Sequence, residues 1–200
     1  MTVDFYNNNA ENFFKNTVDA DMKKAYDIFQ KHLISNTGEI LDLGCGSGRD
    51  SKYFIECGYD ITAIDLSIEL AKKASTYLGK EVIVKDMREL DYCDKFIGIW
   101  ACASLLHLKE NDILKTLQKC YMALKKDGIL YASFKYGNNN YEKDGRYFTC
   151  CTEEKIEKIV DLTNFIVVDM FQTSDVRVGR EKEKWLNIVL KKDRDIEVKK

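Results

Sequence analysis

The sequence predicts an α/β domain built on a mostly parallel β-sheet. Three observations lead to this prediction. Short apolar segments alternate with amphipathic helical segments, the first apolar segment runs directly into a glycine-rich loop, and the last two have no helix between them. Alternating strands and helices form crossover connections, which produce parallel strands with helices on both faces of the sheet. The last two strands should therefore pair antiparallel.

The periodicity of the apolar residues places the individual elements. Strands are expected at residues 40–43, 59–64, 82–84, 96–103, 129–134, 165–171 and 185–190. Helices are expected at residues 21–34, 50–57, 69–78, 112–124 and 153–162. Thr152 has a side chain suited to cap the last helix. Residues 126–128, Lys-Asp-Gly, read as the turn before the strand at 129–134.

A chain of 200 residues suits one domain. We expect a single domain over residues 1–192, with a helical lid at 1–35 and a core at 36–192, followed by a charged tail at 193–200. The first residues lack the basic and apolar regions of a secretory signal, and the longest apolar stretch is about half a membrane span. These features predict a cytoplasmic protein that is not associated with a membrane.

Charge and cysteine usage exclude several classes of protein. There are 31 basic and 33 acidic residues, a formal net charge of −2, so the chain has no global basic surface for nucleic acid. The seven cysteines include no CxxC pair. They are expected to be reduced thiols, without a disulfide framework or a metal site.

The glycine-rich loop, DLGCGSGRD at residues 42–50, is the most informative segment. Alternate glycines allow a tight turn and a close approach of the backbone to a ligand. The helix that follows presents free N–H groups to an anion. A third glycine at position 49 would complete the dinucleotide motif, but that residue is Arg49, and no P-loop lysine is present.

Acidic residues end the next two strands. Asp65 follows Gly44 by 21 residues and can accept hydrogen bonds from both hydroxyl groups of a ribose. Asp86 can accept a hydrogen bond from an adenine amino group, and Met87 can pack on the ring. The pattern therefore indicates a cofactor that contains a nucleoside.

These segments resemble the class I S-adenosylmethionine-dependent methyltransferases. ILDLGCGSGRD is similar to their first motif, and IWACASLLHL resembles the small-molecule branch, which includes the type 11/12/25 and tellurite-resistance-like domains. The opening YNNNA at residues 6–10 is similar to that of several such enzymes. The resemblance implies a Rossmann-like, seven-stranded sheet of order 3-2-1-4-5-7-6. It also implies S-adenosyl-L-methionine as cofactor and S-adenosyl-L-homocysteine as product.

The resemblance further implies which residues contact the cofactor. Asp42 would accept from the cofactor amine or the loop amides, Arg49 would pair with the cofactor carboxylate, and Tyr6 would cover it. The full set of expected contacts is Tyr6, Asp42, Gly44, Cys45, Gly46, Ser47, Gly48, Arg49, Asp65, Leu66, Ser67, Asp86, Met87, Ala101 and Cys102.

The methyl acceptor is expected at the loops after strands four, five and six. Three of the six arginines lie on these loops together with aromatic residues, and arginine favours carboxylate and phosphate groups. We therefore expect a small-molecule acceptor with an acidic group, bound by Tyr136, Arg146, Tyr147, Arg177 and Arg180. His107, after the fourth strand, is a candidate general base for O- or N-methylation.

Other functions remain open at this point. A thiol or a metalloid anion of the tellurite or arsenite kind would need little help from a base. A noncatalytic cofactor-binding scaffold is a further alternative. Nucleic acid is disfavoured as the substrate, because residues 101–104 read Ala-Cys-Ala-Ser where amino-directed DNA methyltransferases carry a proline-containing motif. No large apolar stripe is evident, so we expect a monomer or a weak homodimer.

Overall fold

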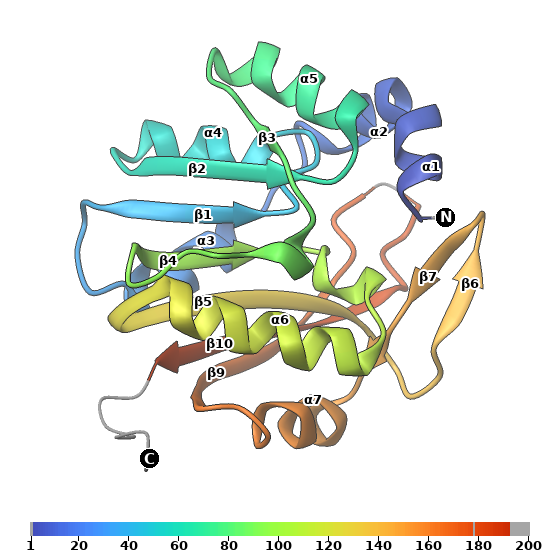
Figure 1. The fold of residues 1–200 in the computed structure, drawn as a ribbon. Helices are drawn as coiled ribbons and strands as arrows, with labels where there is room; N and C mark the ends of the chain where they lie inside the picture. Colours follow the sequence, from blue (N-terminus) through green and yellow to red (C-terminus); the bar gives the residue numbers. More distant parts are fainter. Residues whose placement is uncertain (1, 178, 193–200) are drawn as a thin grey trace.

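The computed structural model describes residues 2–177 and 179–192, and the predicted charged tail at 193–200 lies outside the described residues. The described chain forms a Rossmann-like α/β fold (Figure 1). Its central sheet has one apolar core on each face. Helices α3, α4 and α5 pack on one face, and α6 and α7 on the other.

Within the described residues the main sheet has eight strands. They are β1 (Glu39–Leu43), β2 (Asp60–Asp65), β3 (Ile83–Val84), β4 (Phe96–Ala101), β5 (Leu124–Tyr136), β8 (Cys150–Cys151), β9 (Phe165–Ser174) and β10 (Lys184–Lys192). The order β3-β2-β1-β4-β5-β10-β9 places the seven predicted strands in the predicted sequence. β10 pairs antiparallel with both β5 and β9, as expected from the absence of a helix between the last two strands.

The strand count differs from the prediction in the segment after β5. The short strand β8 pairs parallel with the end of β5, and β6 (Tyr141–Lys143) and β7 (Arg146–Phe148) form a separate hairpin. Asp144 (φ 52°) and Gly145 (φ 72°) make its turn. An Asp-Gly pair between two short strands is a hairpin signal, so this element was detectable in the sequence.

β5 also begins five residues earlier than predicted. Residues 126–128 lie inside it rather than before it, and Asp127 adopts φ 62°. The pairing register with β4 shifts at this place. The Lys-Asp-Gly segment is therefore an irregularity within a strand, because pairing with β4 continues on both sides of it.

Seven α-helices and two short 3₁₀ helices are present in the described residues. They are α1 (Thr2–Asn8), α2 (Ala10–Thr17), α3 (Lys23–His32), α4 (Arg49–Glu56), α5 (Ile68–Leu78), η1 (Met87–Glu89), η2 (Leu105–His107), α6 (Glu110–Ala123) and α7 (Glu153–Val160). Thr152 caps α7 as predicted, because its hydroxyl accepts from the Lys155 amide at 3.4 Å. No helix of the described chain has the length and apolar character to cross a membrane.

The fold brings distant segments to one end of the sheet. Figure 1 shows α1, α2 and the β6–β7 hairpin at the end to which the arrows of β1, β2 and β4 point. Ligands of open parallel sheets bind at the carboxyl ends of the strands. The topology therefore assembles the site from the N-terminal helices, the strand ends and the later loops.

Gly98 allows α3 to approach the sheet closely. A Cβ atom at this position would lie 2.7 Å from Phe29 Cζ and 2.8 Å from Leu33 Cδ2. We predict that Gly98→Ala lowers the free energy of unfolding by about 1–3 kcal/mol, as overpacking of a dense core does. Urea denaturation measures this change, and an unaltered midpoint would contradict the proposed close packing.

Candidate active site

One large cavity occupies this end of the sheet. Its volume is about 1760 Å³, which exceeds the roughly 300–1,000 Å³ of a site for one small ligand. The cavity therefore has room for two molecules. All the predicted site residues line it except Asp42, Gly48, Ala101 and Tyr147.

The glycine loop forms one wall of the cavity. Gly44 has φ +81°, and a Cβ atom there would lie 2.6 Å from the Cβ atom of Ser104. Gly46 has φ +56°, and its Cβ atom would lie 3.1 Å from the ring of Phe13. Side chains at either position would strain the backbone and fill the space beside the loop.

Asp65 fastens this loop to the end of β2. Its carboxylate accepts from the Gly46 amide and from the Ser67 amide, each at 2.8 Å. Burial raises the pKa of Asp65, although these amides act in the opposite direction. The side chain also lines the cavity, so the residue that orders the loop is exposed to a ligand.

A buried hydroxyl group beside the loop has no partner. Ser104 is 6% exposed and its Oγ makes no hydrogen bond in the structure. Buried polar groups in folded proteins are nearly always hydrogen-bonded. The absence of a side chain at Gly44 lets Ser104 approach the loop closely, and the unsatisfied Ser104 hydroxyl fits a polar ligand lying against the loop. Ser104 and Phe13 are site residues that the sequence analysis missed.

Arg49 and Asp42 have protein partners that the sequence did not predict. Arg49 donates to Asp50 through Nε at 2.6 Å and Nη2 at 2.9 Å, and Trp100 donates to the same carboxylate at 2.8 Å. Asp42 accepts from the Ser51 hydroxyl at 2.6 Å and is only 2% exposed. Asp42 thus lies behind the loop, and Arg49 reaches the cavity with its guanidinium already paired.

Three further predicted residues also depart from their expected contacts. The Asp86 carboxylate accepts from the Arg88 side chain, with the shortest contact at 2.6 Å, while Met87 remains at the cavity wall. Gly48 packs against α5, where its Cβ atom would meet Ala74 at 3.2 Å. Ala101 is fully buried in β4.

The cysteines of the site are unsuited to nucleophilic chemistry. Cys45 and Cys102 both line the cavity. Burial raises the pKa of Cys45, and it raises that of Cys102 to about 12. The thiolate is the nucleophilic form, so both residues serve as small wall groups.

His107 is held between two hydrogen bonds. Its Nδ1 lies 2.8 Å from the Tyr147 carbonyl oxygen, and its Nε2 lies 2.7 Å from the Tyr6 hydroxyl group. A carbonyl oxygen only accepts, so Nδ1 carries the proton and Nε2 accepts from Tyr6. Burial lowers the pKa of His107 to about 4. The neutral imidazole therefore keeps its lone pair on Nε2, and Tyr147 contributes backbone rather than a side chain.

Helix α1 connects both halves of the cavity. Asn7 Oδ1 accepts from the Ser67 hydroxyl at 2.7 Å, beside the glycine loop. On the other side, the ring of Phe5 stacks on Arg146, with its centroid 3.8 Å from the guanidinium carbon. Together with the Tyr6–His107 contact, these interactions place α1 across the two ends.

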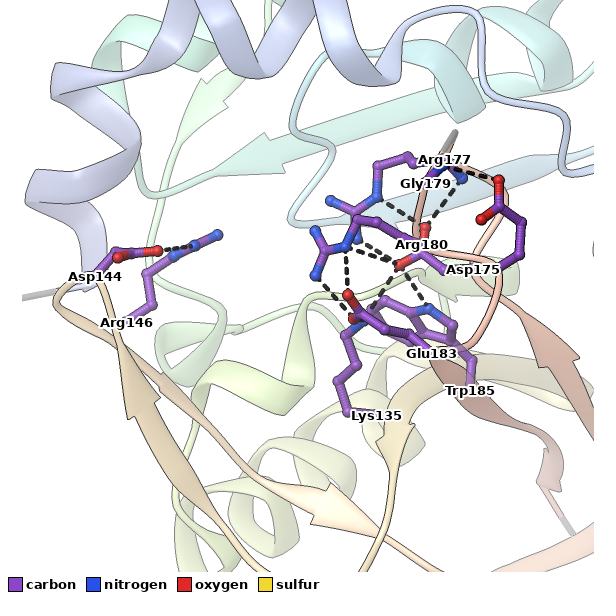
Figure 2. Close-up of polar contacts among 10 residues, drawn as sticks. Lys135, Asp144, Arg146, Asp175, Arg177, Gly179, Arg180, Glu183 and Trp185 are labelled. Atoms are coloured by element: carbon purple, nitrogen blue, oxygen red, sulfur yellow. Dashed lines mark hydrogen bonds and ion pairs between the residues drawn. The ribbon is translucent and has the colours of Figure 1, made fainter.

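The other predicted arginines lie in a cluster of charged side chains, here called the Lys135 cluster. Its members line the cavity at the carboxyl ends of β5 and β9 and the start of β10. They are Lys135, Asp175, Arg177, Arg180 and Glu183. Figure 2 shows this cluster grouped around the ring of Trp185, with the Asp144–Arg146 pair apart from it on the β6–β7 hairpin. Lys135 ends an apolar strand, a signal that the sequence analysis did not use.

The two ends of the cavity differ in charge. Among lining residues 133–187, seven are cationic and three are acidic. The cations are Lys135, Lys143, Arg146, Arg177, Arg180, Lys182 and Lys184, and the acids are Asp144, Asp175 and Glu183. Among lining residues 2–108, three are cationic and four acidic. A positive field is thus confined to one end of a chain with net charge −2.

Residues 40–128 match the family model described as "Methyltransferase domain". This segment, slightly less than half of the chain, is therefore similar to a methyltransferase domain. The chain is 37% identical over 109 residues to methyltransferase YqeM of Bacillus subtilis, a match that covers 49% of this chain and 44% of that protein. A ubiquinone biosynthesis O-methyltransferase of Haemophilus ducreyi is 31% identical over 107 residues, covering 48% of this chain and 44% of that protein.

The fold of the chain is also found in solved structures. A 1,6-didemethyltoxoflavin-N1-methyltransferase of Burkholderia thailandensis superposes with a TM-score of 0.78 and 24% identity. The superposition covers 96% of this chain and 85% of that one. The sequence matches are shorter, and each spans less than half of the curated relative.

The end of β1 contains a titratable group whose effect on stability can be measured. Burial, and then the charge of Asp50, raise the pKa of Asp42 from 3.8 to about 8. Between these values the unfolded chain loses a proton that the folded protein retains, so the free energy of unfolding falls as the pH rises.

Asparagine does not titrate, so Asp42→Asn removes this contribution to the pH dependence of stability. We predict that the variant gains stability relative to the wild type, by a margin that widens from pH 5 to pH 8. Urea denaturation across this range measures the margin. A margin that stays constant or shrinks would show that Asp42 is ionised in the folded protein.

Proposed function

We propose that this protein is an S-adenosylmethionine-dependent methyltransferase that acts on the oxygen or nitrogen of a small molecule with an acidic group. One observation carries the proposal. A single cavity joins a glycine loop fastened by an aspartate to a region of opposite charge character. Two ligands of different chemistry can thus lie next to each other, which is the geometric requirement for a transfer reaction.

The residues present fit the cofactor. Gly44 and Gly46 expose the backbone of the loop to the cavity, and the Ser104 hydroxyl supplies an unused hydrogen-bonding group. Asp65 would accept from the ribose hydroxyls, and Met87 would pack against the base. When bound, the cofactor supplies an electrophilic methyl group attached to a sulfonium centre.

The chain's own contribution is positioning and proton removal. The neutral His107, fixed by the Tyr147 carbonyl, can take a proton at Nε2 when the Tyr6 hydroxyl moves aside or relays it. Phe13 and Tyr6, with ring centroids 5.2 Å apart, cover the loop and exclude water from it. A desolvated nucleophile held in line needs little further assistance.

The acceptor proposal rests on the charge distribution and on the relatives. The cationic end favours an anion, and Tyr141, stacked on Phe148 at 4.9 Å, offers apolar surface beside it. The similar proteins include one named for O-methylation and one for N-methylation of a small molecule. Both support a small acceptor that needs a base.

We predict that S-adenosylhomocysteine binds the wild-type protein and that Asp65→Ala weakens binding by roughly 10-fold or more. Hydrogen bonds to a charged group contribute about 1.5–3 kcal/mol each, and the substitution also releases the Gly46 amide. Isothermal titration calorimetry measures both constants.

Asp60→Ala is the matched control. Asp60 lies at the other end of β2 and does not line the cavity, so binding should remain at the wild-type level. Equal loss in both variants, or no binding by the wild type, would contradict the proposed cofactor site.

A further inference from the structure

The Lys135 cluster is buried at its centre. The side chain of Lys135 is 8% exposed and that of Asp175 is 2% exposed. Lys135 Nζ lies 3.2 Å from the Asp175 carboxylate, contacts Glu183, and sits 4.1 Å from the centroid of the Trp185 ring. A charge in such a place needs close compensation, because burial removes the water that would otherwise stabilise it.

Both carboxylates of the Lys135 cluster are already engaged by arginines. Arg177 donates to Asp175 from Nε at 2.9 Å and Nη2 at 2.6 Å. Arg180 donates to Glu183 from Nε at 2.6 Å and Nη2 at 2.8 Å. Figure 2 shows these paired contacts. The two bidentate arginine pairs neutralise the charges of both carboxylates. Lys135 contacts oxygens of the same two carboxylates and has no carboxylate of its own.

Both acids are ionised at neutral pH. The Arg180 hydrogen bond lowers the pKa of Glu183 to about 2. Burial opposes ionisation of Asp175, but the Arg177 hydrogen bonds outweigh it and lower the pKa of that carboxyl. The Lys135 cluster therefore holds three positive and two negative charges, an excess of one positive charge on the cavity wall.

We infer that the Lys135 cluster is a binding site for one carboxylate group of the methyl acceptor, which supplies the missing negative charge. The inference rests on the proposed function and deepens it by locating and counting the acidic group. A carboxylate carries the single charge required, and lysine and arginine donors suit its oxygens.

Arg146 has a different part in this arrangement. It pairs with Asp144 at 3.2 Å and stacks on the rings of Phe5 and Phe148. Asp144, on the same hairpin, balances the charge of Arg146, so Arg146 does not contribute to the excess positive charge of the Lys135 cluster. We assign Arg146 to the aromatic wall that contacts the apolar body of the acceptor.

Charge counting predicts effects of opposite sign for two substitutions within the Lys135 cluster. Lys135→Met removes the excess charge and should abolish the preference for an anion. Glu183→Gln raises the excess to two and should strengthen anion binding. A network that only stabilised the fold would be weakened by both changes, so the opposite signs distinguish a binding site from a structural ion-pair network.

The experiment measures binding of benzoate, the neutral isostere benzamide and phenyl phosphate to protein saturated with S-adenosylhomocysteine. We expect the wild type to bind benzoate about 10-fold more tightly than benzamide, the range of one charge-assisted hydrogen bond. Lys135→Met should reduce this ratio to about one, and Glu183→Gln should raise it about threefold or more. Glu154→Gln, with the same charge change on α7 and outside the cavity wall, should leave it unchanged.

Three results would overturn the inference. They are equal affinity of the wild type for benzoate and benzamide, weaker benzoate binding in Glu183→Gln, and tighter binding of phenyl phosphate than benzoate, which would assign the site to a phosphate. If Lys135→Met does not fold, the direction in which Glu183→Gln changes the affinity for benzoate tests the inference alone. Failure of S-adenosylhomocysteine to bind would refute the proposed function instead, and benzoate titration of the ligand-free protein would still test the charge count.

Discussion

Two backbone amides converge on the carboxylate of Asp65, and the rest of the site depends on this interaction. The Gly46 amide belongs to the loop after β1, and the Ser67 amide opens the helix after β2. One side chain therefore joins two crossover connections and holds the loop open beside the cavity. Because Asp65 sits at the end of a buried parallel strand, its position follows from the register of β1 and β2 rather than from the loop.

Under the proposed function, the separation of charge in the cavity gives each end a different ligand preference. The acidic residues around the glycine loop are fastened by amides or by Arg49 and Arg88, whereas the opposite end has an excess of cations. Charges enclosed by protein are screened less by water and salt than those on the surface. A small imbalance can therefore discriminate between anionic and neutral acceptors even though the whole chain is nearly neutral.

Helix α1 makes the two ends parts of one structure. Asn7 is bonded beside the cofactor loop, Tyr6 to His107, and Phe5 to Arg146. Movement of this helix would disturb both binding regions together, because its contacts on the two sides come from consecutive residues. Through these packing contacts, α1 can couple the binding of one ligand to that of the other without any change in the conformation of the sheet.

The sequence by itself determined the parallel sheet and the loop with Asp65, because these depend on local periodicity and on spacing along the chain. The strand order followed from the resemblance of its motifs to those of methyltransferases. Only the tertiary structure decided which charges are free. Asp42 and Arg49 match a familiar pattern, yet each has a protein partner, and the excess positive charge arises in the Lys135 cluster, where three cations share two carboxylates. Ion pairing joins residues far apart in the chain, 48 positions for Lys135 and Glu183 and 98 for Lys192 and Asp94, and no local sequence pattern reports such contacts.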